Sequence, residues 1–338
     1  MVRIMDFSDA LTESGARGRG RSVLLGNGFS VAYSPAFGYS RLRDVAVMPG
    51  LSVPKDELFD HAGSSDFETV IDNLRHSADL VRLYGSGSKK FAKRMKADAT
   101  LVKRGLVDAI THVHPHSAWT IPDSKYISAR KFLSGFDGIF TLSYDLLLYW
   151  TLQQVHLSPV VARRDGFGPD GGTLKWTTAG ARGQQVFYLH GAVHLHVLDR
   201  RVRKLTLSAG SNLLDQLQKN LALGRYPLVV TEGSRRDKES RIGRSRYLTN
   251  CLQQLRAVRG DLFVHGMAFS PNDGHILDAI SDGASRIRSL YVGVFGGPSE
   301  ARDEVELRAK ALTRARRRNG GRKLTVHFYQ SESAAPWG

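Results

Sequence analysis

Short apolar runs bounded by turn residues recur along most of the chain and predict β-strands. Several are continuously apolar, as in the stretches SVLL and PLVV, which is typical of strands covered on both faces. Alternation of apolar and polar residues resumes over 193–207 around a charged turn and predicts a hairpin. The predicted strands are 22–25, 137–142, 185–189, 227–231, 261–265, 289–294 and 323–329.

Helical spacing of apolar residues fills the gaps between these runs. Over 66–84, for example, Phe67, Val70 and Ile71 share one face of a predicted helix. Alternating strands and helices predict a Rossmann-like α/β fold, with a mostly parallel sheet of about six strands and helices on both faces. The predicted helices are 66–84, 97–115, 211–223, 246–258 and 300–318.

The predicted elements divide the chain into a tail and one domain. Gly, Ser and Arg dominate from Ser14 to Arg21, so residues 1–21 are expected to form a disordered basic tail. Residues 22–330 then form a single domain. Because strand signals are almost absent between about 55 and 134, this stretch is expected to be a helical insertion beside the sheet.

Composition narrows the class of protein. Apolar residues make up 41% and charged residues 24%, as in soluble globular proteins. No run approaches the roughly 18 apolar residues of a membrane helix, and charges interrupt the N-terminus where a secretory signal needs an apolar stretch. A cytoplasmic protein without membrane association is expected. The single cysteine, Cys251, excludes an internal disulfide and a multi-cysteine zinc site.

A formal net charge of +16 widens the set of expected partners. Clustered Lys and Arg could bind nucleic acid, an acidic partner protein or the phosphates of a nucleotide, or they could form solvated faces. No zinc finger or RNA-recognition signature accompanies the charge, and homo-oligomer formation stays open. The basic clusters lie at 17–21, 200–204, 235–246 and 314–323.

Polar residues follow several predicted strands. After 22–25 comes Gly26-Asn27-Gly28-Phe29-Ser30, where small residues would let backbone N–H groups approach a phosphate, or would simply make a tight turn. Ligands of open α/β sheets bind beyond the carboxyl ends of the strands, so this polarity favours a functional site. Polar residues at the other strand ends are Thr141, Ser143, Tyr144, Asp145, His190, Glu232, Ser270, Asp273 and His275, with Gly266 beside them.

Four of these motifs, in this order, resemble the sirtuin-like NAD-binding superfamily, particularly its bacterial defence-type members. They are the Gly-x-Gly-x-Ser turn, Thr141-Leu-Ser-Tyr-Asp145, His190-Gly191, and Gly266-x-x-x-Ser270-x-x-Asp273. The resemblance covers roughly residues 22–282. It implies NAD as the ligand and an enzyme that hydrolyses NAD to nicotinamide and ADP-ribose, plausible as the toxic effector of a phage-defence system.

The resemblance also implies a role for each residue. His190 would be the general base, since neutral imidazole is available near pH 7. Asp145 would hydrogen-bond the nicotinamide ribose or orient Ser143, and Gly266 with Ser270 would close over the adenosine. The pyrophosphate and nearby ribose would be held by Gly26, Asn27, Gly28 and Ser30, and Phe29, Thr141 and Glu232 complete the expected ligand contacts.

Two departures from the superfamily pattern affect the expected activity. Ser143 stands where the superfamily has an Asn that fixes the attacking water or the ribose, and a hydroxyl lacks the second donor of an amide. Weak turnover, or sensing of NAD or ADP-ribose without turnover, is therefore the alternative function, and nucleic-acid binding is the third. Without the paired cysteines of sirtuin deacetylases, protein deacetylation is not expected. NADP also stays open, because residues 235–246 could receive a 2′-phosphate.

Histidines gather in two stretches, at 112–116 and at 190–196. Alternate residues on a strand share a face without converging on one ion, and no set of acidic ligands accompanies them in sequence. No metal site is therefore expected.

Overall fold

The computed structural model describes residues 3–15, 20–84, 88–170, 173–177, 183–206, 212–223, 225–231 and 235–338. Two compact units divide the chain. The sheet unit comprises Met1–Tyr33, Pro115–Val229 and Ser245–Gly338, and the helical unit comprises Ser34–His114 and Val230–Arg244.

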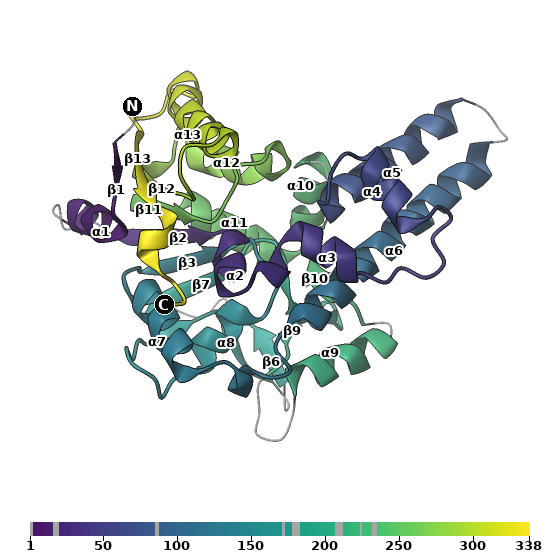
Figure 1. Ribbon diagram of the computed structural model, residues 1–338, viewed down its shortest axis with the longest axis horizontal. Helices are drawn as coiled ribbons and strands as arrows, with labels where there is room; N and C mark the ends of the chain where they lie inside the picture. The colour runs from purple at the N-terminus through teal and green to yellow at the C-terminus, as the bar shows by residue number, and fades with distance from the viewer. Residues whose placement is uncertain are drawn as a thin grey trace. The chain divides into compact units, whose positions relative to one another are not determined.

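Within the described residues, eight strands form the main sheet of the sheet unit, and every neighbouring pair is parallel (Figure 1). Helices flank this sheet, so the expected Rossmann-like α/β class is confirmed. Across the sheet the strands are β1 (Ile4–Met5), β13 (Thr325–Gln330), β12 (Arg286–Val294), β11 (Arg259–His265), β2 (Arg21–Leu25), β3 (Gly138–Thr141), β7 (Gln184–Tyr188) and β4 (Arg163–Arg164).

The direction in which the chain adds strands to the main sheet changes at β2. From β2 the chain adds β3 and then β7 on one side, whereas β11, β12 and β13 follow on the other side. Numbered along the chain, these strands lie in the order 3-2-1-4-5-6 of dinucleotide-binding sheets. The order reverses between β2 and β11, and the crevice beyond their carboxyl ends is where such sheets bind ligands.

Continuous apolar runs form the centre of this sheet, as the sequence predicts. Val23, Leu24 and Leu25 of β2 are fully buried, and Leu24 pairs with Phe140 of β3 and Val264 of β11. Side chains of a strand point alternately to the two faces, so burial of consecutive residues requires cover on both.

Some helices of the sheet unit begin at a polar capping residue, as α13 (Glu300–Arg318) does, where the Ser299 side chain accepts a hydrogen bond from the N–H of Arg302. That helix also places Glu300 in its first turn and Arg316–Arg318 in its last, which suits the helix dipole. The helices are α1 (Phe7–Gly15), α2 (Gly28–Tyr33), α7 (Asp123–Ser134), α8 (Leu147–Gln153), α9 (Leu213–Ala222), α11 (Arg246–Arg256), α12 (Gly274–Ser281) and α13 (Glu300–Arg318).

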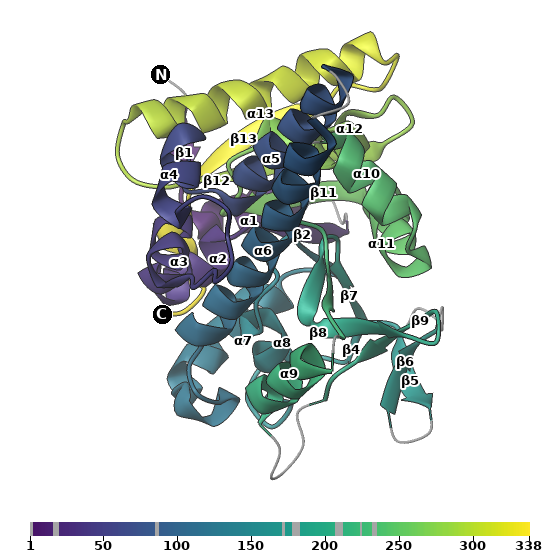
Figure 2. The ribbon, with the colours of Figure 1, turned by 90° about the vertical axis from the view of Figure 1, so that its right-hand side faces the viewer.

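A second, antiparallel sheet belongs to the same unit (Figure 2). Its order within the described residues is β10 (Pro227–Val229), β8 (Gly191–Leu198), β9 (Arg201–Lys204), β6 (Thr173–Trp176) and β5 (Phe167–Asp170). The predicted hairpin is confirmed as β8 and β9, joined through Asp199 and Arg200, which both have positive φ as in a type I′ turn. The strand predicted at 227–231 is β10, which pairs with β8 and not with the parallel sheet.

Residues 1–21 were expected to form a disordered tail, but the structure has a strand and a helix within this range. Residues 4–5 form β1 beside β13, and α1 follows. The ring of Phe7 lies 5.3 Å from those of Phe132 and Tyr329, so burial of this aromatic side chain holds the segment against the sheet unit. The Gly- and Arg-rich residues 16–19 lie outside the described residues.

The helical unit differs in its bounds from the insertion expected at 55–134. It begins at Ser34 and ends at His114, and Val230–Arg244 joins it. Helix α7, which was expected in the insertion, belongs to the sheet unit because Phe132 packs against Phe7 and Phe136. The helices of the helical unit are α3 (Tyr39–Val45), α4 (Lys55–His61), α5 (Phe67–Leu83), α6 (Lys89–Val113) and α10 (Arg235–Gly243).

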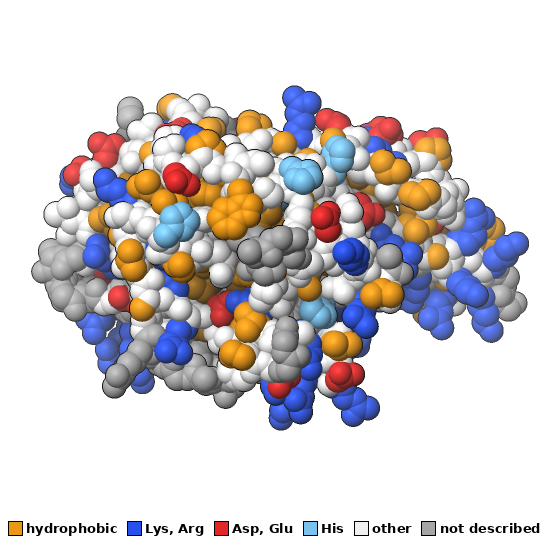
Figure 3. Space-filling model, turned by 90° about the horizontal axis from the view of Figure 1, so that it is seen from below, with side chains coloured by type: hydrophobic (Ala, Val, Ile, Leu, Met, Phe, Trp, Pro, Cys, Tyr) orange, Lys and Arg blue, Asp and Glu red, His pale blue; other side chains and the backbone are white. Residues whose placement is uncertain are grey.

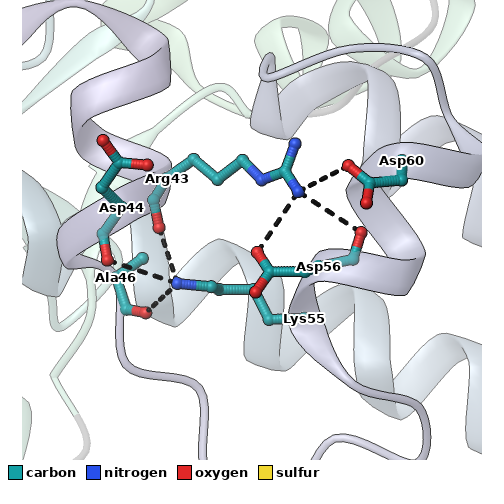
Figure 4. A network of polar contacts seen from close by, with 6 residues as sticks. All are labelled: Arg43, Asp44, Ala46, Lys55, Asp56 and Asp60. Atoms are coloured by element: carbon teal, nitrogen blue, oxygen red, sulfur yellow. Dashed lines mark hydrogen bonds and ion pairs between the residues drawn. The ribbon is translucent and has the colours of Figure 1, made fainter.

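Polar contacts tie the helical unit together. The Lys55 ammonium donates to carbonyl oxygens at the end of α3, those of Arg43 at 2.8 Å, Asp44 at 3.3 Å and Ala46 at 3.2 Å, while the Arg43 guanidinium bonds Asp60 on α4 at 2.6 Å (Figure 4). Lys238 of α10 forms a buried ion pair with Glu68 of α5 at 2.6 Å. No described helix is both long and apolar enough to span a membrane.

We predict that acid destabilises the sheet unit through His265. Burial lowers the pKa of His265 to about 4, so the unfolded chain takes up a proton that the folded chain resists. The free energy of unfolding therefore keeps its full value above about pH 6.5 and falls, by up to about 3 kcal/mol, as the pH drops toward 4. Urea unfolding at pH 7 and pH 5 measures this loss.

The control for this prediction is a variant in which His265 and its hydrogen-bond partner Tyr329 are both replaced. Nδ1 of His265 lies 3.1 Å from the Tyr329 hydroxyl, so His265→Phe is combined with Tyr329→Phe. This double variant should lose less stability between the two pH values than the wild type does. An equal loss would show that other groups cause the acid sensitivity.

Candidate functional site

Two turns meet at the carboxyl edge of the main sheet, between β2 and β11. The N–H groups of Gly26 and Gly28 donate to the carbonyl oxygens of His265 and Gly266, each at 2.9 Å. A Cβ atom on Gly28 would lie 2.4 Å from the Cα of Gly266, and one on Gly266 would lie 2.5 Å from the Cα of Gly28. The glycines are therefore required by the contact between the two turns.

The glycine-rich turn was expected to let backbone N–H groups approach a phosphate, and the structure contradicts this expectation. The space left by the missing Cβ atoms of Gly26 and Gly28 is filled by the Gly266 turn, and their N–H groups are bonded within the protein. The following N–H groups form the first hydrogen bonds of α2, as where the backbone N–H of Ser30 donates to the carbonyl of Asn27 at 2.9 Å. Phe29 is buried against Trp337, with ring centres 5.1 Å apart, and is a core residue.

Ser30 and Asp145 join α2 to the loop that leads from β3 into α8. The Ser30 hydroxyl donates to Oδ2 of Asp145 at 2.5 Å, and the N–H of Leu147 donates to Oδ1 at 2.9 Å. Burial raises the pKa of the Asp145 carboxyl, although these two hydrogen bonds act to lower it. Asp145 thus holds the first turn of α8 and the first turn of α2 in place. Its bond to Ser30 uses the hydroxyl that was expected to contact a phosphate.

The end of β3 and the loop after it bond to the segment that leads from β7 into β8. The N–H of Leu189 donates to the carbonyl of Thr141 at 2.9 Å, and that of Val193 donates to the carbonyl of Tyr144 at 2.8 Å. The Thr141 hydroxyl accepts the N–H of Ser143 at 3.1 Å. The Ser143 hydroxyl itself is buried and has no hydrogen-bond partner among the described residues. A buried hydroxyl that lacks a partner is costly unless a ligand or water satisfies it.

His190, between β7 and β8, lies in a cluster with residues that follow β11. Its Nε2 atom is 2.9 Å from Nε2 of His275 and 3.8 Å from Oδ1 of Asp273. Both imidazoles are buried, and the ring of Tyr144 stacks at 6.3 Å from that of His190. The sheet thus brings together side chains more than 80 positions apart, since 85 residues separate the two histidines.

This cluster is suited to moving a proton. In a neutral pair of imidazoles one ring donates the shared hydrogen and the other accepts it. A proton added to His190 would place positive charge 3.8 Å from the Asp273 carboxylate, which stabilises that charge. A base that can accept a proton, with a carboxylate to stabilise the product, is the usual arrangement of general-base catalysis.

The loop from β11 to α12 has an unusual backbone. Gly266 and Phe269 have φ of 69° and 55°, and Phe269 is one of the described non-glycine residues in the left-handed region. For a non-glycine residue such as Phe269 this conformation costs about 1–3 kcal/mol, and such residues often lie at functional sites. Ser270 caps the 3₁₀ turn Pro271–Asp273, because its hydroxyl accepts the N–H of Asn272 at 3.4 Å.

The structure therefore brings together part of the predicted set. His190 lies beside Asp273 and His275, two polar residues for which the sequence predicted no role. Their signal in the sequence is that they are polar residues in the segment that follows β11. Thr141 and Ser143 bond each other, and the Thr141 carbonyl accepts the N–H of Leu189, the neighbour of His190. Asp145 and Ser30 bond each other. Glu232 lies outside the described residues. Within those residues no group of three or more His, Cys, Asp or Glu could hold a metal ion.

Two of the predicted basic clusters contain ion pairs with acidic residues. In the 200–204 cluster, Lys204 pairs with Asp165 and Arg203 pairs with Asp170 at 3.2 Å. In the 235–246 cluster, Arg235 pairs with Glu239 at 3.0 Å on the same helix. Lys and Arg side chains on the face shown in Figure 3 lie in separate groups. Part of the positive charge of these clusters is thus paired with acidic residues, which the net charge of +16 already counts.

Comparison with known proteins places this chain in a family. No curated protein matches the chain. A family model described as a domain of unknown function (DUF4917) matches residues 23–337, a span that includes the main sheet from β2 onward and the whole His190 cluster. The chain therefore belongs to this family.

Proposed function

We propose that the carboxyl edge of the main sheet binds NAD and hydrolyses its nicotinamide–ribose bond, with His190 as general base. The observation that carries this proposal is the cluster of His190, His275 and Asp273. It lies at the edge where a 3-2-1-4-5-6 sheet binds dinucleotides, which adds support from the topology. The resemblance to sirtuin-like proteins supplies the substrate and a role in phage defence.

The proposed reaction balances with water as the only other reactant. The oxygen of a water molecule forms a bond to C1′ of the ribose while the bond from C1′ to the nicotinamide nitrogen breaks. The bonding electron pair stays on nicotinamide, which leaves as a neutral ring, and ADP-ribose remains. His190 takes the proton of the attacking water, and Asp273 stabilises the imidazolium that results.

A second candidate is a sensor that binds NAD or ADP-ribose without turnover. It is favoured by Ser143 in place of the superfamily Asn, and by the use of the Gly26 and Gly28 N–H groups in contacts within the protein. Both observations reduce the number of donors available to a reacting nucleotide.

Incubation of the purified protein with NAD separates these functions. Release of nicotinamide and ADP-ribose in equal amounts supports the hydrolase. Binding of NAD by calorimetry, without release of nicotinamide, supports the sensor and rejects the hydrolase. Neither binding nor release would reject both.

We predict that Ser143→Asn increases hydrolysis, by up to about a hundredfold, because it restores the amide that the superfamily uses to position water or ribose. The unpartnered Ser143 hydroxyl marks a buried position where a further donor can be used. The initial rate of nicotinamide release is the measurement, and Ser143→Ala is the matched control, expected to be no faster than wild type. If the Asn variant is slower than the Ala variant, position 143 does not orient the reacting groups.

A further inference from the structure

A pocket of about 780 Å³ opens at the amino ends of the main-sheet strands, the edge opposite the His190 cluster. Four arginines line it: Arg259 at the start of β11, Arg286 and Arg288 on β12, and Arg322 just before β13. Gly20, directly before β2, completes the wall. All of these residues belong to the sheet unit, and the pocket plays no part in the proposed hydrolysis.

The arginines of this pocket have no ion-pair partner among the described residues; the Asp137 carboxylate next to Gly20 accepts the N–H of Arg21 at 3.0 Å. Across the described ranges, no hydrogen bond or ion pair involves the side chain of any of the four arginines, and no acidic residue is among those that line the pocket. Asp282, in the loop before β12, is not a lining residue, and its carboxylate accepts the N–H of Ala284 at 2.8 Å. Arg286 and Arg288 flank the buried Ile287, and both side chains are exposed and line the pocket. Their mutual repulsion would be relieved by an anion.

Buried contacts hold the wall of the pocket in shape. The guanidinium of Arg316 is buried and donates to the carbonyl oxygens of Ile280, Ser285 at 3.0 Å and Ile287 at 3.3 Å. The side-chain amide of Asn319 donates to the carbonyl of Ser281 at 3.0 Å. The loop from α12 to β12 is therefore fixed from behind, so the arginines in front of it are presented on a preformed surface.

The size and lining of the pocket indicate the class of ligand. A volume of about 780 Å³ is within the range of roughly 300–1,000 Å³ of small-molecule sites. No described aromatic side chain lines it, so bases cannot stack there as they do in single-strand-binding proteins. Guanidinium groups match phosphate oxygens in geometry and charge. We propose that this pocket binds a compact ligand that carries several phosphate groups.

Calorimetric titration with inorganic tripolyphosphate at low ionic strength tests this proposal. The double variant Arg286→Gln/Arg288→Gln should weaken binding at least tenfold, and Arg322→Gln alone should weaken it by a smaller factor. The matched control is Arg82→Gln/Arg246→Gln, which removes the same charge from exposed positions outside the pocket. Because all of these side chains are exposed, thermal unfolding should be nearly unchanged.

Two results would overturn the proposal even where the wild type binds tripolyphosphate. One is a loss of affinity in the control equal to that of the pocket variant, since binding would then follow net charge alone. The other is tighter binding of a 20-nucleotide single strand than of tripolyphosphate through the same arginines, which would assign the surface to nucleic acid. Absence of measurable tripolyphosphate binding to the wild type would also reject the site.

Discussion

His190→Ala should lower NAD hydrolysis by about a hundredfold to ten-thousandfold, which is the contribution of a positioned general base. The loss should be in the maximal rate, because the imidazole acts on water and not on the remote parts of the nucleotide. NAD affinity should stay within a few fold of wild type. Nicotinamide release under saturating NAD measures the first quantity, and calorimetry measures the second.

A structural effect of the same substitution has to be separated from a chemical one. His190 is buried and bonded to His275, so its removal leaves a buried imidazole nitrogen without that contact, at a cost of about 1–3 kcal/mol. His190→Gln keeps a hydrogen-bonding side chain at this position and should be equally inactive with a smaller loss of stability.

His194→Gln is the matched control. It removes another buried imidazole, which stacks on Tyr149 at 4.3 Å and has no contact with the cluster among the described hydrogen bonds. The folded fraction of this variant should hydrolyse NAD at the wild-type rate. If His190→Gln is as active as His194→Gln, His190 is not the base.

Gly266→Ala should lower the free energy of unfolding by about 3 kcal/mol or more. The added Cβ would suffer the strain of a left-handed backbone, and it would lie 2.5 Å from the Cα of Gly28, where the backbone cannot yield without breaking the paired turns. Urea unfolding measures the change, and NAD affinity should fall with it because both turns border the proposed site.

Gly296→Ala separates the two causes. Gly296 has φ of 74°, close to the 69° of Gly266, but a Cβ there would meet nothing within 4 Å. Its cost should be about 1–2 kcal/mol, from strain alone. Equal costs for the two variants would show that the turns after β2 and β11 are not locked together.

The central strands were predictable from sequence because burial on both faces demands continuous apolar runs. Strands such as β1 and β4 were not, since each has only two residues and lies at an edge where little side-chain burial is required. Assignment of β10 to the second sheet depends on its pairing with β8, a tertiary contact that periodicity does not encode.

The candidate site was also predictable only in part, because its residues meet through tertiary contacts that the local sequence does not encode. His190 stood out because it ends a strand in a His-Gly pair. Its partners Asp273 and His275 lie several residues beyond the end of β11, and only the 3₁₀ turn and α12 bring them back toward β7. The role of Gly26 and Gly28 also depends on a residue far away in sequence, Gly266, whose backbone occupies the space that their missing side chains leave.

Hydrogen–deuterium exchange of the His190→Gln variant with and without NAD tests the location of the nucleotide most directly, because this variant should bind NAD without consuming it. Binding at the carboxyl edge predicts slower exchange in residues 26–31, 142–147, 189–193 and 266–276, and unchanged exchange in 283–288. Slower exchange confined to 283–288 and 320–324, with none at the carboxyl edge, would contradict it.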